Sequence, residues 1–319
     1  MSKAARRNLR VLVGVVVLAI VVWRLGFGAL RDGVLAVDVP SVAVAAAGTA
    51  GTTLAAAWRW RRVAAGLGMS VPLPTAVAAY YRSQFLNSVL PGGVLGDVHR
   101  GVRQGQEADD VGMGLRSVMW DRIGGQAVQL VLTAALLVAF PSPVRKALPY
   151  VLGAAAFVLA LGVLLATRGR RRSGSRWARL VDGLRQDLHD GVLRRQAWPL
   201  ILLSSGLVVF GHITVFLVAA RAAGVHAGIA TVIPLAALIL LLSALPTNIA
   251  GWGPREGTAA WAFGIAGLGA RSGVAAAACY GAVSFLAVLP GAVVLYLGRR
   301  RARSDTRTSD RRLQGVAHG

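Results

Sequence analysis

Six apolar segments of the chain are each long enough to cross a lipid bilayer, and they constrain the fold more than any other feature. A transmembrane helix needs about 20 mostly apolar residues, because the hydrocarbon core offers no partners for exposed backbone groups. The segments therefore predict an all-α polytopic membrane protein. The predicted spans are Leu9–Gly28, Val39–Trp58, Ser117–Phe140, Leu148–Thr167, Ala197–Ala220 and Gly273–Leu297.

The composition agrees with this class and argues against soluble alternatives. The chain is 55% apolar and only 15% charged, with 35 Lys and Arg against 13 Asp and Glu. A nucleic-acid-binding protein could be this basic but would not also be this apolar, so we expect no nucleic-acid partner. Basic cytoplasmic loops between apolar spans account for both properties. The single cysteine, Cys279, cannot form an intrachain disulfide.

The positions of the basic clusters predict the orientation. The positive-inside rule places all clusters in the cytoplasm, so an even number of crossings must separate neighbouring ones. We expect a cell inner (cytoplasmic) membrane protein with both termini in the cytoplasm. The clusters are the N-terminus, the group Arg59, Arg61 and Arg62, the segment 168–195, and the tail from Arg299.

Two shorter apolar segments, Thr75–Leu90 and Thr231–Leu245, do not fit as simple spans. If Thr75–Leu90 crossed the membrane, the basic cluster at 168–195 would lie outside the cell, against the positive-inside rule. The second must contribute zero or two crossings. The prediction is therefore about six full spans plus two re-entrant helical hairpins.

The two doubtful segments resemble each other and indicate an internal repeat. Ser88–Gly96 and Ser243–Gly251 both fit S-x-L-P-x-x-[VI]-x-G, at an offset of 155 residues. Chance similarity competes, because Ala, Leu and Gly are abundant. The first copy follows a loop that the predicted topology places in the cytoplasm, and the second follows Arg221, which the same topology places outside. The two copies are therefore expected to be inverted relative to each other. Inverted repeats with broken helices are typical of transporters.

The predicted organisation is one integral membrane domain over residues 1–298, with the halves 1–140 and 148–298 as inverted repeats. Apolar residues at helical spacing predict an amphipathic helix at about 172–195 on the cytoplasmic leaflet. The tail 299–319 is polar and basic and is expected to be disordered. Motifs of nucleotide, zinc and serine-hydrolase sites are absent, and the histidines have no ligand spacing. We therefore expect no cofactor, no metal and no catalytic residue.

Polar and ionisable residues at membrane depth are functional candidates by default. Asp121 is expected to pair with Arg82 or Arg100, and Glu256 with an arginine across the repeat interface. The predicted substrate-binding residues are Arg82, Gln84, Asn87, Gly92, Gly93, Asp97, Arg100, Asp121, Arg122, Asn248, Arg255 and Glu256.

Each candidate also has a purely structural interpretation. Asp121 and Arg122 could set the depth of a span, and Arg255 and Glu256 could lie in a solvated extracellular loop. Arg100 fits ordinary positive-inside bias. Gln84 and Asn87 could simply hold helices together. Trp58 and Trp60, beside the basic cluster at Arg59, are most simply an interfacial anchor, although the cluster could also hold phosphate headgroups.

Three sequence blocks resemble a known family. They are Gln84–Asp97, Asp121–Gly124 and Ala250–Gly257, and they are similar to the transmembrane, flippase-like region of lysylphosphatidylglycerol synthases and their stand-alone relatives. The resemblance covers roughly residues 10–298. It implies a polytopic protein that handles lipid-linked molecules. The residues that it highlights are Asn87, Pro91, Gly92, Gly93, Gly96, Asp97, Asp121, Arg122, Gly251, Gly253, Arg255 and Glu256.

The functional expectation is a flippase-like lipid translocase that moves or handles phospholipid or lipid-linked headgroups. The full synthases carry a soluble aminoacyl-transfer domain, and this chain ends at Gly319; we expect that it does not make lysyl-lipid itself. One alternative is an intramembrane enzyme or accessory subunit acting on polyprenyl-phosphate or glycolipid. Another is a non-catalytic partner of a separate synthase or glycosyltransferase.

Overall fold

Four of the described helices are long and apolar enough to cross a membrane. The computed structural model describes residues 27–90, 92–153, 198–244 and 252–298, together with a few positions between 156 and 187. The long helices are α3 (Val39–Gly66), α6 (Val111–Ala139), α9 (Trp198–Ala222) and α12 (Ala270–Val288), which continues past a turn at Leu289 to Gly298.

These four helices match four of the six predicted spans. The other two, Leu9–Gly28 and Leu148–Thr167, lie mostly outside the described residues. The same holds for the predicted amphipathic helix at 172–195 and the tail 299–319. The number of spans therefore stays a prediction.

Two of the spans differ in length from the sequence prediction. Helix α3 begins at its N-cap Asp38, whose carboxylate accepts a hydrogen bond from Ser41 N at 2.8 Å, and it continues past Trp58 to Gly66. Helix α6 begins after Asp110, whose side chain accepts from Met113 N at 2.8 Å. Because α6 starts earlier than predicted, Asp121 lies within the helix and not at its start.

Each doubtful apolar segment forms the first arm of a pair of short helices. The first pair is α4 (Leu73–Val89) and α5 (Leu95–Glu107), and the second is α10 (Ile229–Ser243) and α11 (Pro254–Ile265). Between α4 and α5, Gly92 and Gly93 have φ angles of +90° and +59°. Glycine adopts this left-handed conformation without steric cost, so the chain can turn sharply here.

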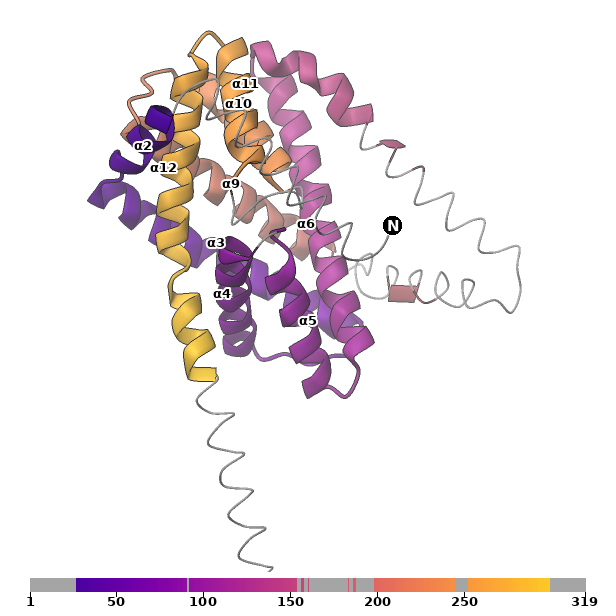
Figure 1. Ribbon diagram of the computed structural model, residues 1–319. Helices are drawn as coiled ribbons and strands as arrows, with labels where there is room; N and C mark the ends of the chain where they lie inside the picture. Colours follow the sequence, from indigo (N-terminus) through magenta and orange to yellow (C-terminus); the bar gives the residue numbers. More distant parts are fainter. Residues whose placement is uncertain are drawn as a thin grey trace, which may run out of the picture.

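Helices α3 to α6 and helices α9 to α12 follow the same order: a long helix, two short helices and a second long helix. The α4–α5 pair packs on the start of α6 and the end of α12, as the close approaches of Gly101 to Gly114 and of Tyr81 to Gly291 show. The α10–α11 pair packs on the end of α6 and the start of α12, where Gly273 lies against Ala259. In Figure 1 the two pairs accordingly lie toward opposite ends of these long helices.

The buried apolar side chains of the described residues form two main clusters and a smaller one between α2 (Phe27–Leu35) and α12. One contains Trp60, Tyr80 and Val118 from α3, α4 and α6. The larger one joins α9 to α12 with the end of α6 and includes Phe216 and Phe263. Helix α2 packs against α12, and the short 3-10 helix η1 (Pro143–Ala147) follows α6. Between the two main clusters the helices enclose polar side chains.

Candidate functional site

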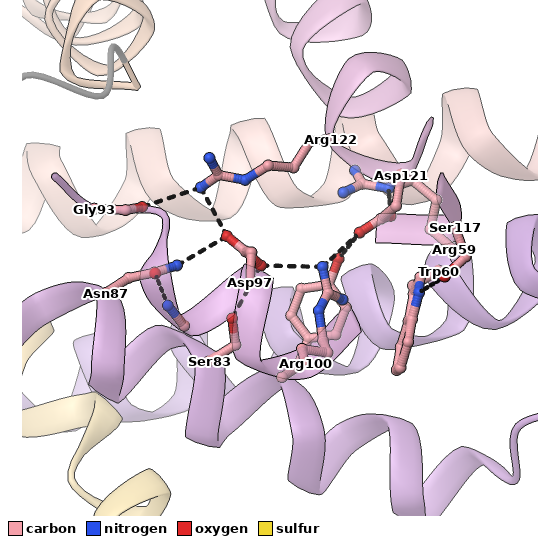
Figure 2. A network of polar contacts seen from close by, with 12 residues as sticks. Arg59, Trp60, Ser83, Asn87, Gly93, Asp97, Arg100, Ser117, Asp121 and Arg122 are labelled. Atoms are coloured by element: carbon pink, nitrogen blue, oxygen red, sulfur yellow. Dashed lines mark hydrogen bonds and ion pairs between the residues drawn. The ribbon is translucent and has the colours of Figure 1, made fainter. Parts of the chain in front are cut away.

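Asp97, in the first turn of α5, is the centre of a polar network that joins both helices of the α4–α5 pair to α6 (Figure 2). Its carboxylate accepts hydrogen bonds from Ser83 Oγ and Asn87 Nδ2, each at 2.9 Å. It also forms an ion pair with Arg122 Nη2 at 2.9 Å. A fourth partner is Arg100 Nη2, which lies 3.1 Å from Asp97 Oδ1.

The turn between the arms is fitted closely to this network. Asn87 Oδ1 accepts a hydrogen bond from Gly96 N at 2.8 Å. A Cβ atom at position 96 would lie 2.1 Å from the carbonyl oxygen of Ser83, so only glycine fits without a shift of the backbone. Arg122 Nη2 also donates to the carbonyl oxygen of Gly93 at 3.3 Å.

Asp121, which directly precedes Arg122 in α6, is completely enclosed by donors. Its carboxylate accepts from Arg59 Nε at 2.8 Å and from Arg100 Nη2 at 3.1 Å. The hydroxyl of Tyr80 donates to the same group. Only 1% of Asp121 is exposed. Two buried guanidinium groups therefore share this carboxylate, and Arg100 also pairs with Asp97.

Arg100 links the two aspartates and has unused donor capacity. Its Nη2 lies 3.1 Å from both Asp97 Oδ1 and Asp121 Oδ2. Its guanidinium stacks 3.9 Å from the ring centre of Tyr80 and 4.5 Å from that of Trp60. The side chain is buried, and neither Nε nor Nη1 has a hydrogen-bond partner.

A second charged cluster lies at the start of α11 in the other half. Glu256 Oε2 accepts from Gly253 N at 2.7 Å, which caps the helix. Glu256 Oε1 accepts from Arg255 Nε at 2.9 Å and Nη2 at 2.6 Å. Both side chains are buried, and the Arg255 guanidinium lies 5.4 Å from the ring centre of Trp252 and 5.5 Å from that of Tyr280.

Two cavities connect these clusters. The first, of about 180 Å³, is lined by Asp97, Arg100 and Asp121 with polar residues of α3, α4, α6 and α9. The second, of about 350 Å³, reaches Arg255, Tyr280 and the end of α10. They meet at the shared lining residues Gln126, Gln129, Val208, Val209 and His212. Polar space therefore extends from one short-helix pair toward the other.

Most of the predicted residues come together. Six line the first cavity: Gln84, Asn87, Asp97, Arg100, Asp121 and Arg122. Gly92 and Gly93 form the turn beside it, Arg255 lines the second cavity, and Glu256 lies behind Arg255. Arg82 is buried but lines neither cavity. Asn248 lies outside the described residues.

The expected pairing of Asp121 with Arg82 or Arg100 is confirmed for Arg100, and Arg59 is a second, unpredicted partner. One other pairing and one structural interpretation were wrong. Glu256 pairs with its neighbour Arg255 and not with an arginine of the other half, because the Arg255 side chain folds back over the first turn of α11. Arg255 and Glu256 are buried, so they do not lie in a solvated loop.

Two other structural interpretations stay predictions. Arg100 and Asp121 are each 1% exposed and lie within the polar cluster. Their burial favours a role inside the protein over positive-inside bias for Arg100 and a depth-setting role for Asp121.

The interfacial anchor predicted at Trp60 was wrong as well. Trp60 is fully buried, and its Nε1 donates to Ser117 Oγ at 3.0 Å. Arg59, grouped with the surface cluster by sequence, is buried, and its Nη1 donates to Ser205 Oγ at 2.9 Å. A signal for Arg59 existed: Thr52, Ala56 and Arg59 repeat at helical spacing and share one face of α3.

Other residues of the cavity also went unpredicted. Gln126 and Gln129 follow Arg122 at helical spacing on α6, and His212 Nδ1 lies 3.1 Å from the Tyr280 hydroxyl. Within the described residues, no group of His, Cys, Asp and Glu side chains could hold a metal ion.

A comparison with protein families identifies the chain. The family described as "Lysylphosphatidylglycerol synthase TM region" matches residues 9–291, which confirms the resemblance seen in the sequence blocks. No curated protein and no solved structure matches. The match covers most of the chain and includes the four long apolar helices. The chain therefore belongs to the lysylphosphatidylglycerol synthase TM region family and is a multi-pass membrane protein.

Proposed function

We propose that this protein is a lipid translocase that moves the phosphate-bearing headgroup of a membrane lipid through its interior. The observation that carries the proposal is the polar space between the two short-helix pairs, lined by Arg59, Arg100, Arg122 and Arg255. Ionisable groups at membrane depth are costly and mark pathways for polar substrates. The acyl chains would stay in the bilayer while the headgroup passes between the helices.

The chemistry of the lining favours a headgroup with one negative charge. The first cavity has three lining arginines and two aspartates, so the formal charge of its walls is positive by one. Guanidinium groups bind phosphate through charge-assisted hydrogen bonds, and the buried Nε and Nη1 donors of Arg100 have no hydrogen-bond partner among the described residues. The family name adds the context of an anionic phospholipid and its aminoacylated product.

The test is lipid exchange in vesicles that contain the purified protein. Fluorescently labelled phosphatidylglycerol, aminoacylated phosphatidylglycerol and phosphatidylcholine are each added to both leaflets, and an impermeant quencher is then applied outside. The proposal expects the protected inner-leaflet fraction to become accessible faster than in empty vesicles for at least one phosphate-headgroup lipid. Exchange no faster than in empty vesicles for all of them would contradict translocation.

The two short-helix pairs would be inverted re-entrant hairpins. Support comes from the same helix order in both halves and from the packing of the pairs on opposite ends of α6 and α12. Helices α4, α5, α10 and α11 have 17, 13, 15 and 12 residues, so none reaches the length of about 20 that a span requires.

Labelling of single cysteines tests this arrangement. Ser70→Cys and Gln106→Cys flank the first hairpin, and His226→Cys and Gly264→Cys flank the second, all in a Cys279→Ala background. An impermeant thiol reagent should label the first two from one side of the membrane and the last two from the other. Labelling of all four from the same side would exclude the inverted arrangement.

A further inference from the structure

Arg100 and Arg255 have closely similar surroundings although they lie in different halves of the chain. Each guanidinium stacks on one Trp and one Tyr: Trp60 and Tyr80 for Arg100, and Trp252 and Tyr280 for Arg255. Each is also paired with a carboxylate. Aromatic faces hold a guanidinium in place and leave its in-plane donors available for an oxyanion.

The surroundings of Arg100 and Arg255 contain the same types of side chain, but these do not occupy equivalent positions of the sequence repeat. The carboxylate of Arg255 comes from its neighbour Glu256, whereas Arg100 is bound by Asp97 and Asp121. Tyr80 belongs to the first short-helix pair, whereas Tyr280 belongs to the long helix α12. The same combination of Arg, Trp, Tyr and carboxylate is therefore built at each end of the polar space from different elements.

The space between the two arginines has a different character. The cavities share Gln126 and Gln129 of α6 and Val208, Val209 and His212 of α9, and none of these side chains carries a permanent charge. The hydroxyl of Tyr280 lies 3.1 Å from His212 Nδ1 at this junction. The residues that both cavities share therefore carry no permanent charge, whereas the charged side chains line one cavity or the other.

We infer that the interior holds two separate binding sites for a single phosphate group, one at Arg100 and one at Arg255, divided by a neutral neck of Gln126, Gln129, Val208, Val209 and His212. This inference rests on the proposed function. The lipid headgroup resides at one site or the other, and the neck is the barrier that it crosses between them. The two valines are apolar, and the two glutamines and the histidine supply hydrogen bonds to the passing headgroup.

Cysteine protection tests whether there are two sites. Ala56→Cys lines only the first cavity and Ala244→Cys only the second, and both are introduced into a Cys279→Ala background. The probes are dihexanoylphosphatidylglycerol, which carries the phosphate as a lipid headgroup, and inorganic phosphate, which carries it free. Each probe is tested for slowing of the reaction with a small thiol reagent in detergent solution.

If there are two sites, each arginine substitution should weaken the protection of only one of the two cysteines. Arg100→Gln should weaken protection at position 56 by about tenfold or more, and leave position 244 protected as before. Arg255→Gln should do the opposite. Protection by the short-chain lipid but not by free phosphate assigns both sites to lipid headgroups, and protection by both probes assigns them to the phosphate group itself. Loss at both positions from either single substitution would show one site and overturn the inference.

The neck is tested by filling it. Val208→Trp places a large side chain at the junction of the cavities, and Leu207→Trp, its neighbour on α9, places the same side chain on the exposed face. Val208→Trp should abolish lipid exchange in vesicles while protection at positions 56 and 244 persists. Leu207→Trp should exchange lipid like the unaltered protein. Equal exchange by the two variants would show that the headgroup does not pass the neck.

The two readouts separate this inference from the proposed function. If the unaltered protein exchanges no lipid, translocation fails, whatever the protection data show. If it exchanges lipid but a single arginine substitution removes protection at both positions, translocation stands and the two-site inference fails. Circular dichroism and gel filtration of each variant confirm that the fold is retained before either readout is used.

Discussion

At the scale of single residues, Asp121 has the most consequential environment in the molecule. Two buried guanidinium groups, those of Arg59 and Arg100, share its carboxylate, and Tyr80 donates a third hydrogen bond. In a buried site the attraction between such charges mainly offsets the cost of removing them from water. The cluster therefore contributes little net stability while intact, but losing Asp121 removes the carboxylate that compensates the buried Arg59.

Asp121→Asn should consequently destabilise the protein strongly. The substitution keeps the shape of the side chain and removes the carboxylate that pairs with Arg59 and one of the two that pair with Arg100. Breaking a buried pair in this way costs about 3–5 kcal/mol. Thermal unfolding in detergent measures the effect. Glu107→Gln is the matched control, because the Arg103–Glu107 pair is about half exposed and should contribute about 0.5 kcal/mol or less. Equal losses for the two variants would mean that Asp121 does not compensate the arginines.

The residue scale also shows where sequence reasoning succeeded and failed. Asp97, Arg100 and Asp121 could be selected because charges at membrane depth are rare and costly. Arg59 could not be separated from Arg61 and Arg62 by charge alone, since a basic cluster at the end of a span normally lies in the cytoplasm. The partner that buries Arg59 lies 62 residues away, and that contact belongs to the packing of α3 against α6.

At the scale of helices, the close approach of α4 to α5 depends on one small residue. The backbone of Gly96 lies against Ser83 and Asn87, which allows Asn87 to bind both Gly96 N and Asp97. The position of the Asp97 carboxylate in the cavity therefore depends on this contact.

Gly96→Ala should separate the two arms and disturb the Asp97 network. An added Cβ would lie 2.1 Å from the carbonyl oxygen of Ser83, and such overpacking costs about 1–3 kcal/mol. Gly51→Ala, on the exposed face of α3 with nothing within 4 Å, should instead gain up to about 1 kcal/mol from the better helix propensity of alanine. Thermal unfolding compares the two. A Gly96→Ala variant that unfolds at the same temperature as the unaltered protein would show that the two helices are not in close contact.

Helices were easier to predict than their ends and partners. Hydropathy located four long helices because it depends only on local composition, and the S-x-L-P motif located both breaks. The start of α6 was missed because Asp109, Asp110 and Arg116 lower the local hydropathy, although Asp110 caps the helix. The meeting of the cavities at His212 follows from how α9 lies between α6 and α12, which no local pattern encodes.

At the scale of the whole molecule, the arrangement of two similar halves around one polar interior forms the basis of the functional proposal. Each half contributes a pair of short helices and a stacked arginine, and the cavities meet between them. The net charge of +22 carries little of this information, because most of the basic residues fit the cytoplasmic bias of loops and tail. The informative charges are the few that the helices bury.

The most direct test of the central claim is phosphatidylglycerol exchange by Arg100→Gln and Arg103→Gln in vesicles. Both substitutions remove one positive charge from α5, but Arg100 lines the cavity whereas Arg103 is nearly half exposed and does not. We predict that Arg103→Gln exchanges lipid at the rate of the unaltered protein. Arg100→Gln should be slower by roughly 10- to 100-fold, the loss expected for hydrogen bonds to a charged group. Equal rates for the two variants would contradict passage of the headgroup through the interior.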